Sequence, residues 1–321
     1  MYHPGRSIRL RSSARSDRGR VRQNNEDSVH LWDADTSVLA VVADGMGGAV
    51  AGEEASRIAV ETIQGKLTTA YYRSPDDYSQ YDTVELAALM GDAVREANDN
   101  IMEKVDIAPE LKGMGTTVTM AFARANDVIL AHVGDSRAYY IDASDSSIEQ
   151  LTSDHSFVQA LVDAGHITDE EAENHPMKNV LYRALGQADE LDVDVLMDIR
   201  IHAGDRLLLC SDGLTLHVNA DEIAETAMSS DDPQVISDKL VNLANERGGK
   251  DNVSVIVIVA EWQDTKEVAL AEEDTVVPYA GEDDEPTIPM NPDYLNVTRA
   301  NPSLDTIETK DDPQATQETP S

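Results

Sequence analysis

Two short apolar runs are each followed by Asp-Gly, and this pattern places a carboxylate where a strand is expected to end. The stretches are VVADG at residues 41–45 and LLCSDG at residues 208–213. A buried strand that ends in Asp presents its carboxylate at the mouth of a sheet, and the glycine lets the backbone turn so that its carbonyl can face the same point. Asp44-Gly45 and Asp212-Gly213 therefore predict two parts of an oxygen-lined site.

Two further acids lie beside expected strands, so four carboxylates can converge from distant parts of the sequence. Asp27 ends the stretch NNED at 24–27, and Asp251 lies in GGKDN at 248–252. Oxygen ligands favour Mg²⁺ or Mn²⁺, whereas Zn²⁺ prefers His and Cys. The alternative is a pair of ordinary turns, because Asp-Gly is a common turn dipeptide and the chain holds 61 acidic residues.

The elements that would position these acids are short buried strands and amphipathic helices. Apolar runs at residues 38–43, 128–131, 207–210 and 253–260 predict strands, and alternation around Ile8 and Leu10 predicts a first one. Helices are expected over residues 51–67, 84–105, 219–228 and 233–246, with Asp82-Thr83 as a start signal for the second. Strands and helices do not alternate regularly, which favours an α+β fold over a doubly wound sheet.

Composition divides the chain and excludes several classes of protein. Of 61 acidic and 25 basic residues, 46 and 22 lie in residues 1–261, a net charge of −24, which predicts one acidic folded domain. Residues 262–321 hold 15 acidic residues and seven of the 12 Pro without periodicity, typical of a disordered tail. The charge of −36 disfavours nucleic-acid binding, no apolar run is long enough for a membrane span, and a single Cys without a signal segment predicts the cytoplasm.

Six motifs occur in a fixed order along the domain, and together they carry a resemblance to a known family. The chain resembles the metal-dependent Ser/Thr protein phosphatases of type 2C, bacterial subgroup, from about Ser16 to Val259. Residues 154–186 resemble the flap subdomain of the bacterial members. The motifs are RQNNED at 22–27, VADGMGG at 42–48, GMGTT at 113–117, VGDSR at 133–137, CSDG at 210–213 and DNVS at 251–254.

The resemblance implies a fold, a metal centre and a reaction. The fold would be two packed antiparallel β-sheets flanked by helices, an α-β-β-α sandwich with a small flap. Two Mn²⁺ or Mg²⁺ ions would be held by Asp27, Asp44, Asp212 and Asp251 with the Gly45 carbonyl. Two hard cations lower the pKa of a bound water, so water can attack a phosphoester near neutral pH without a covalent intermediate.

Three further roles are implied by the same resemblance. Glu26 would reach a metal ion through water, and Asp135 together with Asp212 would bind a third metal ion. Arg22 matches the phosphate clamp, and a guanidinium can bind two phosphate oxygens at once. Some family members carry His where this chain has Met46 or Ala49. Protonation of the leaving group is therefore expected from water and not from a His of this loop.

The expected function is hydrolysis of phosphoserine and phosphothreonine in protein substrates, in a family that commonly opposes a Ser/Thr kinase. Thr275 and Thr287 in the tail could be phosphorylated and bound by a phospho-reading partner. Two alternatives stay open: a binding protein that keeps the fold without catalysis, and a hydrolase of small phosphoesters. Cysteine and serine hydrolases are disfavoured, because no Arg follows Cys210 in residues 211–218 and GDSRA at 134–138 lacks the second elbow glycine.

Overall fold

The computed structural model describes residues 6–34, 37–69 and 81–264. The chain divides into residues 1–274 and 275–321, and all described residues belong to the first unit. The predicted tail from residue 265 onwards, with Thr275 and Thr287, lies outside the described residues. The domain boundary predicted at residue 261 falls inside a strand that continues to Asp264.

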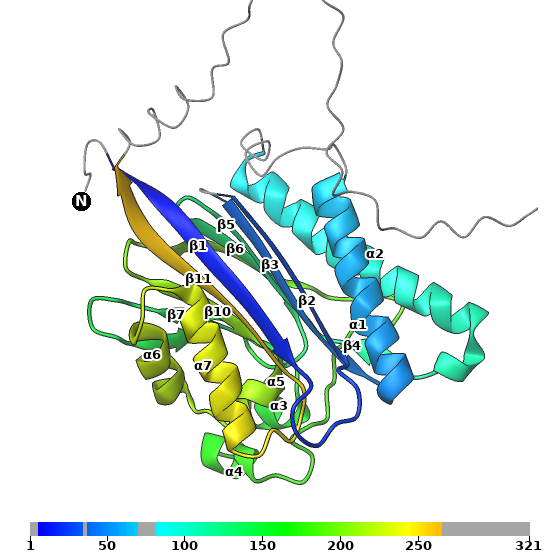
Figure 1. The fold of residues 1–321 in the computed structure, drawn as a ribbon. Coiled ribbons are helices and arrows are strands. Elements are labelled where there is room, and N and C mark those ends of the chain that lie inside the picture. Colours follow the sequence, from blue (N-terminus) through cyan, green and yellow to red (C-terminus); the bar gives the residue numbers. More distant parts are fainter. Residues whose placement is uncertain (1–5, 35–36, 70–80, 265–321) are drawn as a thin grey trace, which may run out of the picture. The chain divides into compact units, whose positions relative to one another are not determined.

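Two antiparallel sheets form the centre of the domain (Figure 1). The first has the order β1-β11-β10-β7-β8, and the second the order β2-β3-β5-β6-β9, with β4 paired to β3. The strands of the first are β1 (Arg6–Asp17), β11 (Val253–Asp264), β10 (Arg206–Cys210), β7 (Arg137–Ile141) and β8 (Ile148–Gln150). Those of the second are β2 (Asp27–Ala34), β3 (Ser37–Met46), β4 (Gly115–Thr116), β5 (Val118–Arg124), β6 (Asp127–Val133) and β9 (Asp194–Arg200).

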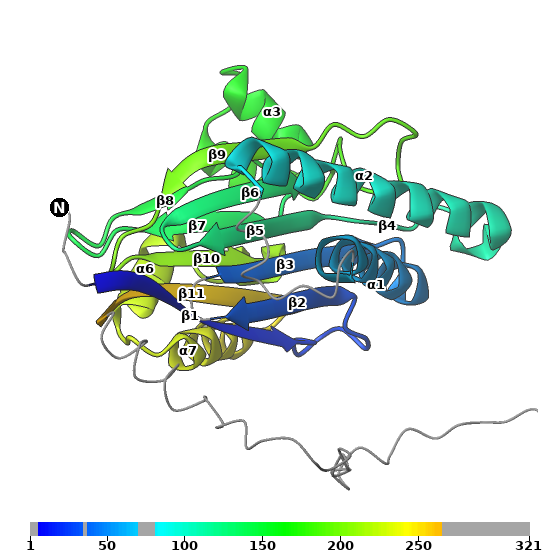
Figure 2. The same cartoon turned by 90° about the horizontal axis from the view of Figure 1, so that it is seen from above.

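Helices cover the outer faces of both sheets, with α1 and α2 on one side and α6 and α7 on the other (Figures 1 and 2). Capping residues fix where three of them begin: Asp82 and Asn219 each form a capping box, and Asp232 accepts a bond from the Gln234 amide. The α-helices are α1 (Ala49–Gln64), α2 (Thr83–Ile107), α3 (Phe157–Asp163), α4 (Asp169–Glu173), α5 (Asp212–Thr215), α6 (Ala220–Met228) and α7 (Pro233–Glu246). A π-helical turn (Gly65–Thr69) follows α1, and a 3₁₀ turn (Pro109–Leu111) follows α2.

The packing of β3 explains why its sequence is apolar on both faces. Leu39 and Val41 pack in the cluster beneath α1 and α2, whereas Val38 and Val42 pack between the two sheets. Successive side chains of a strand point to opposite faces, so a strand covered on both sides needs a continuous apolar run. A third cluster joins the first sheet to α6 and α7. The four layers confirm the predicted α-β-β-α sandwich.

The predicted elements agree with the observed ones where periodicity was strong. The four apolar runs lie in β3, β6, β10 and β11, and the four helical segments correspond to α1, α2, α6 and α7. The turn expected at each Asp-Gly pair, in both interpretations, is wrong: β3 does not end at Asp44 but continues through Gly45 to Met46, and Asp212-Gly213 begins α5. Neither glycine has a positive φ.

Candidate active site

The register of the second sheet places two of the predicted acids side by side. Asp27 is the first residue of β2, and its cross-strand partner on β3 is Asp44. The Gly45 amide donates to the Glu26 carbonyl at 3.1 Å, which continues this pairing beyond the end of the strand. Thr117 holds the Asp44 backbone from the other side: its hydroxyl accepts from the Asp44 amide at 3.0 Å, and its own amide donates to the Asp44 carbonyl at 2.9 Å.

The glycine of each Asp-Gly pair is required by close backbone packing. A Cβ at Gly45 would lie 2.1 Å from the carbonyl oxygen of Gly52 in α1. A Cβ at Gly213 would lie 1.9 Å from the carbonyl oxygen of Asn252. Contacts this short are sterically forbidden, so glycine lets α1 and the start of β11 approach the two acidic segments.

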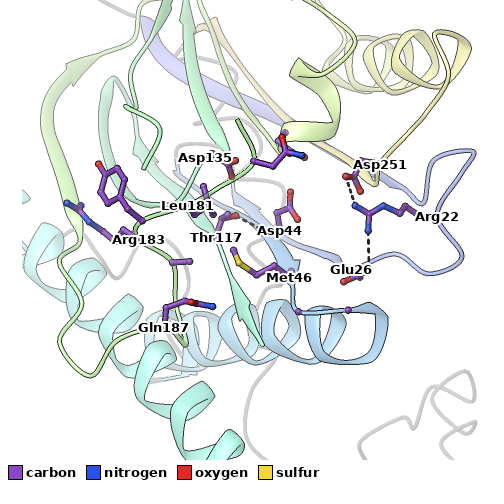
Figure 3. A pocket seen from close by; sticks show the side chains of 17 residues that line it. Arg22, Glu26, Asp44, Met46, Thr117, Asp135, Leu181, Arg183, Gln187 and Asp251 are labelled. Atoms are coloured by element: carbon purple, nitrogen blue, oxygen red, sulfur yellow. Dashed lines mark hydrogen bonds and ion pairs between the residues drawn. The ribbon is translucent and has the colours of Figure 1, made fainter. Parts of the chain in front are cut away.

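These segments border a pocket of about 360 Å³ at one end of the two sheets (Figure 3). Its walls carry five carboxylates and two guanidinium groups, those of Arg22 and Arg183. The acids come from separate parts of the chain, which the two sheets bring together. They are Glu26, Asp44, Asp135, Asp212 and Asp251. The predicted residues Arg22 and Gly45 also line the pocket.

Asp27 lies behind this wall and does not line the pocket. It is buried, and its Oδ2 accepts hydrogen bonds from the hydroxyls of Ser254 at 2.6 Å and Ser211 at 2.8 Å. Its Oδ1 is buried without a hydrogen-bond partner. Burial raises the pKa of Asp27 to about 7, against the two serine hydrogen bonds, which favour the ionised form.

The pocket acids are held close enough to oppose one another's ionisation. Burial, followed by the charge of Asp251, raises the pKa of Asp212 to about 6. Burial, followed by the charges of Asp27, Asp212 and Asp135, raises the pKa of Asp44 well above its usual value. The pKa of Asp135 is raised to about 8 by burial and by the charge of Asp212. Bound cations would therefore strongly stabilise the ionised form of these carboxylates.

Arg22 stands at the edge of the pocket, between two acids (Figure 3). Its guanidinium lies 2.7 Å from an Asp251 carboxylate oxygen and 3.6 Å from a Glu26 carboxylate oxygen. The Asn252 side chain holds the loop that carries Arg22. Its Nδ2 donates to the backbone carbonyls of Arg18 and Asn24, and its Oδ1 accepts from the backbone amide of Glu26. The Arg22 side chain remains 45% exposed, which leaves it accessible to an anion.

The donor set fits divalent cations, although no ready-made cage is present. Within the described ranges, no three carboxylate, imidazole or thiol groups already have ligand spacing. Instead, Arg22 contacts carboxylate oxygens of Asp251 and Glu26. Ser211 and Ser254 donate hydrogen bonds to Oδ2 of Asp27. The fit rests on the unpaired Oδ1 of buried Asp27 and on five pocket carboxylates that two guanidinium groups cannot neutralise. Hard all-oxygen donors of this kind suit Mn²⁺ or Mg²⁺.

Several residues of the site lie within the ordered motifs or the predicted flap, but their individual roles were not predicted. Thr117, Ser211 and Ser254 act through hydrogen bonds to Asp44 and Asp27, and polar residues of this kind are common everywhere. Residues 179–187 supply six of the 17 lining residues, including Arg183. Met46 lines the pocket, and no His is among the lining residues in the described part of the chain.

Comparison with known proteins agrees with this fold and site. A profile of the family described as "Protein phosphatase 2C" matches residues 17–248. The chain therefore belongs to the protein phosphatase 2C family.

Named relatives in bacteria are serine/threonine phosphatases. The chain is 42% identical over 248 residues to "Serine/threonine protein phosphatase PstP" of Mycobacterium tuberculosis, and the match covers 77% of this chain. It spans 44% of that relative, less than half of its length. With "Serine/threonine phosphatase stp" of Listeria welshimeri the identity is 36% over 252 residues, covering 78% of this chain and 95% of the relative.

Solved structures share the fold. The crystal structure of the Mycobacterium tuberculosis phosphatase PstP/Ppp superposes with a TM-score of 0.69 at 41% identity, covering 79% of this chain and 99% of that one. The catalytic domain of PstP in complex with two manganese ions has a TM-score of 0.68 at 39% identity, covering 79% and 100%.

Proposed function

We propose that this chain is a metal-dependent protein-serine/threonine phosphatase. The observation that carries the proposal is the pocket itself, in which five carboxylates and Arg22 gather at one end of a phosphatase 2C fold. Asp44, Asp212 and Asp251 with the Gly45 carbonyl, and Asp27 from behind, would hold two Mn²⁺ or Mg²⁺ ions. Asp135, with Asp212, would hold a third ion, and Glu26 would act through water.

The residues of the chain bind and orient the phosphoester. Arg22 is exposed at the pocket edge and can form two parallel hydrogen bonds to phosphate oxygens, which offsets charge in the transition state. Because Glu26 and Asp251 contact Arg22, they hold its guanidinium at the pocket rim. When bound, the cations supply neutralisation of the carboxylates and activation of water. A covalent phosphoenzyme is not required.

Phosphate release from a phosphothreonine peptide tests the proposal. The purified full chain is assayed with EDTA, Mg²⁺ and Mn²⁺ in parallel. We expect release in Mn²⁺ or Mg²⁺ and none in EDTA. Activity that persists in EDTA would contradict a metal-dependent mechanism. If metal binds and no phosphate is released from peptides or small esters, the chain is a binding protein of the same fold.

The cellular setting follows from the proposed activity. The substrates would be phosphorylated proteins that include an opposing Ser/Thr kinase, and the acidic tail would offer Thr275 and Thr287 to a phospho-reading partner. A cytoplasmic location is supported by one cysteine, Cys210, which is buried and unpaired. Over the ranges that the structure describes, no helix has the length and apolar character needed to cross a bilayer.

A further inference from the structure

His155 is a buried histidine that lies outside the pocket and contacts two of its walls. Only 2% of the residue is exposed. It directly follows Asp154, which forms a two-point ion pair with Arg137 at 2.9 and 2.7 Å. This ion pair anchors the residue that precedes His155 to β7.

On one side, His155 holds the corner that precedes Asp135. Its backbone amide donates to the Gly134 carbonyl at 2.7 Å, and its Nδ1 accepts from the Gly134 amide at 3.0 Å. Gly134 has a φ of 115°, and a Cβ there would lie 2.5 Å from Thr117, so no other residue fits this corner. Both polar groups of the glycine are therefore bonded to His155.

On the other side, His155 holds the wall formed by residues 181–183. Its carbonyl accepts from the Tyr182 amide at 3.0 Å. Nε2 lies 3.1 Å from Asp194 Oδ2 and 3.1 Å from Arg183 Nη1. Because Nδ1 is an acceptor, Nε2 carries the proton and donates to Asp194, and Arg183 does not donate to it. Asp194 in turn accepts from Arg183 at 2.6 Å. Burial lowers the pKa of His155, which favours this neutral form.

This wall extends from the pocket toward solvent. Leu181, Tyr182 and Arg183 all line the pocket, and Tyr182 is 56% exposed. Figure 3 shows Leu181 and Arg183 on the side of the pocket opposite Arg22. A small phosphoester fits within the reach of Arg22 and the acids, whereas a polypeptide extends beyond the pocket, where the exposed Tyr182 offers it a contact surface.

We infer that His155 is a positioning residue that sets the preference for polypeptide substrates by fixing the 181–183 wall relative to the Gly134-Asp135 corner. The inference rests on the proposed phosphatase function. His155 touches neither the phosphate nor the carboxylates that would hold metal. His155 instead fixes the positions that Tyr182 and Arg183 take when a peptide binds.

The test compares His155→Ala, His155→Asn and Asp194→Ala with the control His166→Ala, an exposed histidine of the same region. Two substrates are used in Mn²⁺: a phosphothreonine peptide and p-nitrophenyl phosphate. We expect kcat/KM for the peptide to fall by about tenfold, mainly through KM, with less than about a twofold change for p-nitrophenyl phosphate. Asp194→Ala removes the acceptor that His155 Nε2 and Arg183 share and leaves the Gly134 contacts in place, so it keeps the test valid if His155→Ala does not fold.

A binding measurement separates this inference from the proposed activity. Fluorescence anisotropy of a labelled phosphonate analogue of the peptide, which is not hydrolysed, gives its Kd for the Mn²⁺-loaded wild type and variants. We expect the Kd to be about tenfold higher in the His155 and Asp194 variants and unchanged in His166→Ala. Equal losses on both substrates, unchanged peptide affinity, or a wild type without peptide affinity would overturn the inference. Binding without turnover in the wild type would count only against the proposed function.

Discussion

At the scale of single residues, the site depends on side chains that hold other side chains. Arg22 is bracketed by Asp251 and Glu26, and Asp27 is held by two serine hydroxyls. A buried carboxylate with one oxygen fully bonded and the other unpaired is costly unless a cation completes it. Phosphate binding by Arg22 and metal binding by Asp27 can therefore be tested separately.

Arg22→Ala should weaken phosphate binding without altering the fold. We expect a higher KM and a loss of about 2–4 kcal/mol in transition-state binding from kcat/KM, because a two-point donor to phosphate is removed. Steady-state kinetics with a phosphothreonine peptide measure this loss. Arg20→Ala is the matched control, since Arg20 is exposed in the same loop and contacts Asp17 outside the pocket. Equal kinetics for Arg22→Ala and wild type would remove Arg22 from the site.

Ser211→Ala and Ser254→Ala should weaken metal binding, because each releases one hydrogen bond that orients Asp27. We expect the Mn²⁺ Kd measured by isothermal titration calorimetry to rise by about tenfold or more, the usual effect of losing a residue that orients a ligand. Ser237→Ala is the control: Ser237 is buried, but it bonds Ser13 beneath α7. If all three variants bind Mn²⁺ alike, the two serines do not orient a metal ligand.

At the scale of elements, strand ends and close helix contacts place the acids. Asp27 and Asp44 are cross-strand partners, and the backbone of α1 at Gly52 packs directly on Gly45. The first sheet adds Asp212 after β10 and Asp251 before β11. Only when the two sheets pack do these four acids come to the same end of the molecule.

Gly45→Ala should destabilise the domain, since the new Cβ would lie 2.1 Å from the Gly52 carbonyl. We expect the free energy of unfolding in urea to fall by about 1–3 kcal/mol, as for other overpacked positions. Gly65→Ala is the control, because it has right-handed helical angles and no atom within 4 Å of its Cβ. It should be neutral or slightly stabilising. A Gly45→Ala variant as stable as wild type would show that α1 can move away from β3 without cost.

The sequence predicts these elements well where the signal is local. Apolar runs and caps such as Asp82 define strands and helices within a few residues of their observed bounds. The ordered motifs predict the acids of the pocket, but not that Asp27 would lie behind its wall. The serines that hold Asp27 are 184 and 227 residues away from it in the chain. His155 joins two walls through backbone groups, so its contacts depend on the folded arrangement and not on any local pattern.

At the scale of the whole molecule, an acidic protein must bind an anionic substrate. The chain carries a net charge of −36, and five of the seven charged groups that line the pocket are carboxylates. Divalent cations invert the local charge, so metal is needed both for binding and for chemistry. Metal should therefore also affect the stability of the fold.

In EDTA the protein should lose stability as pH rises. Burial raises the pKa of Asp27 from 3.8 to about 7, so the native state binds its proton more tightly than the unfolded chain does. The free energy of unfolding therefore falls as pH increases from about 4 to about 7. Thermal unfolding between pH 5 and 8 measures this slope, and Mn²⁺ should reverse the loss at the upper end. A slope unchanged by Asp27→Asn would mean that Asp27 does not cause it.

The central claim is that the acidic pocket performs metal-dependent phosphoester hydrolysis, and one comparison tests it directly. Phosphate release from a phosphothreonine peptide in Mn²⁺ is measured for wild type, Asp212→Asn and the control Glu225→Gln, an exposed acid on α6. We predict that Asp212→Asn abolishes turnover, whereas Glu225→Gln retains it. Substantial activity in folded Asp212→Asn would contradict the claim and place the chemistry elsewhere.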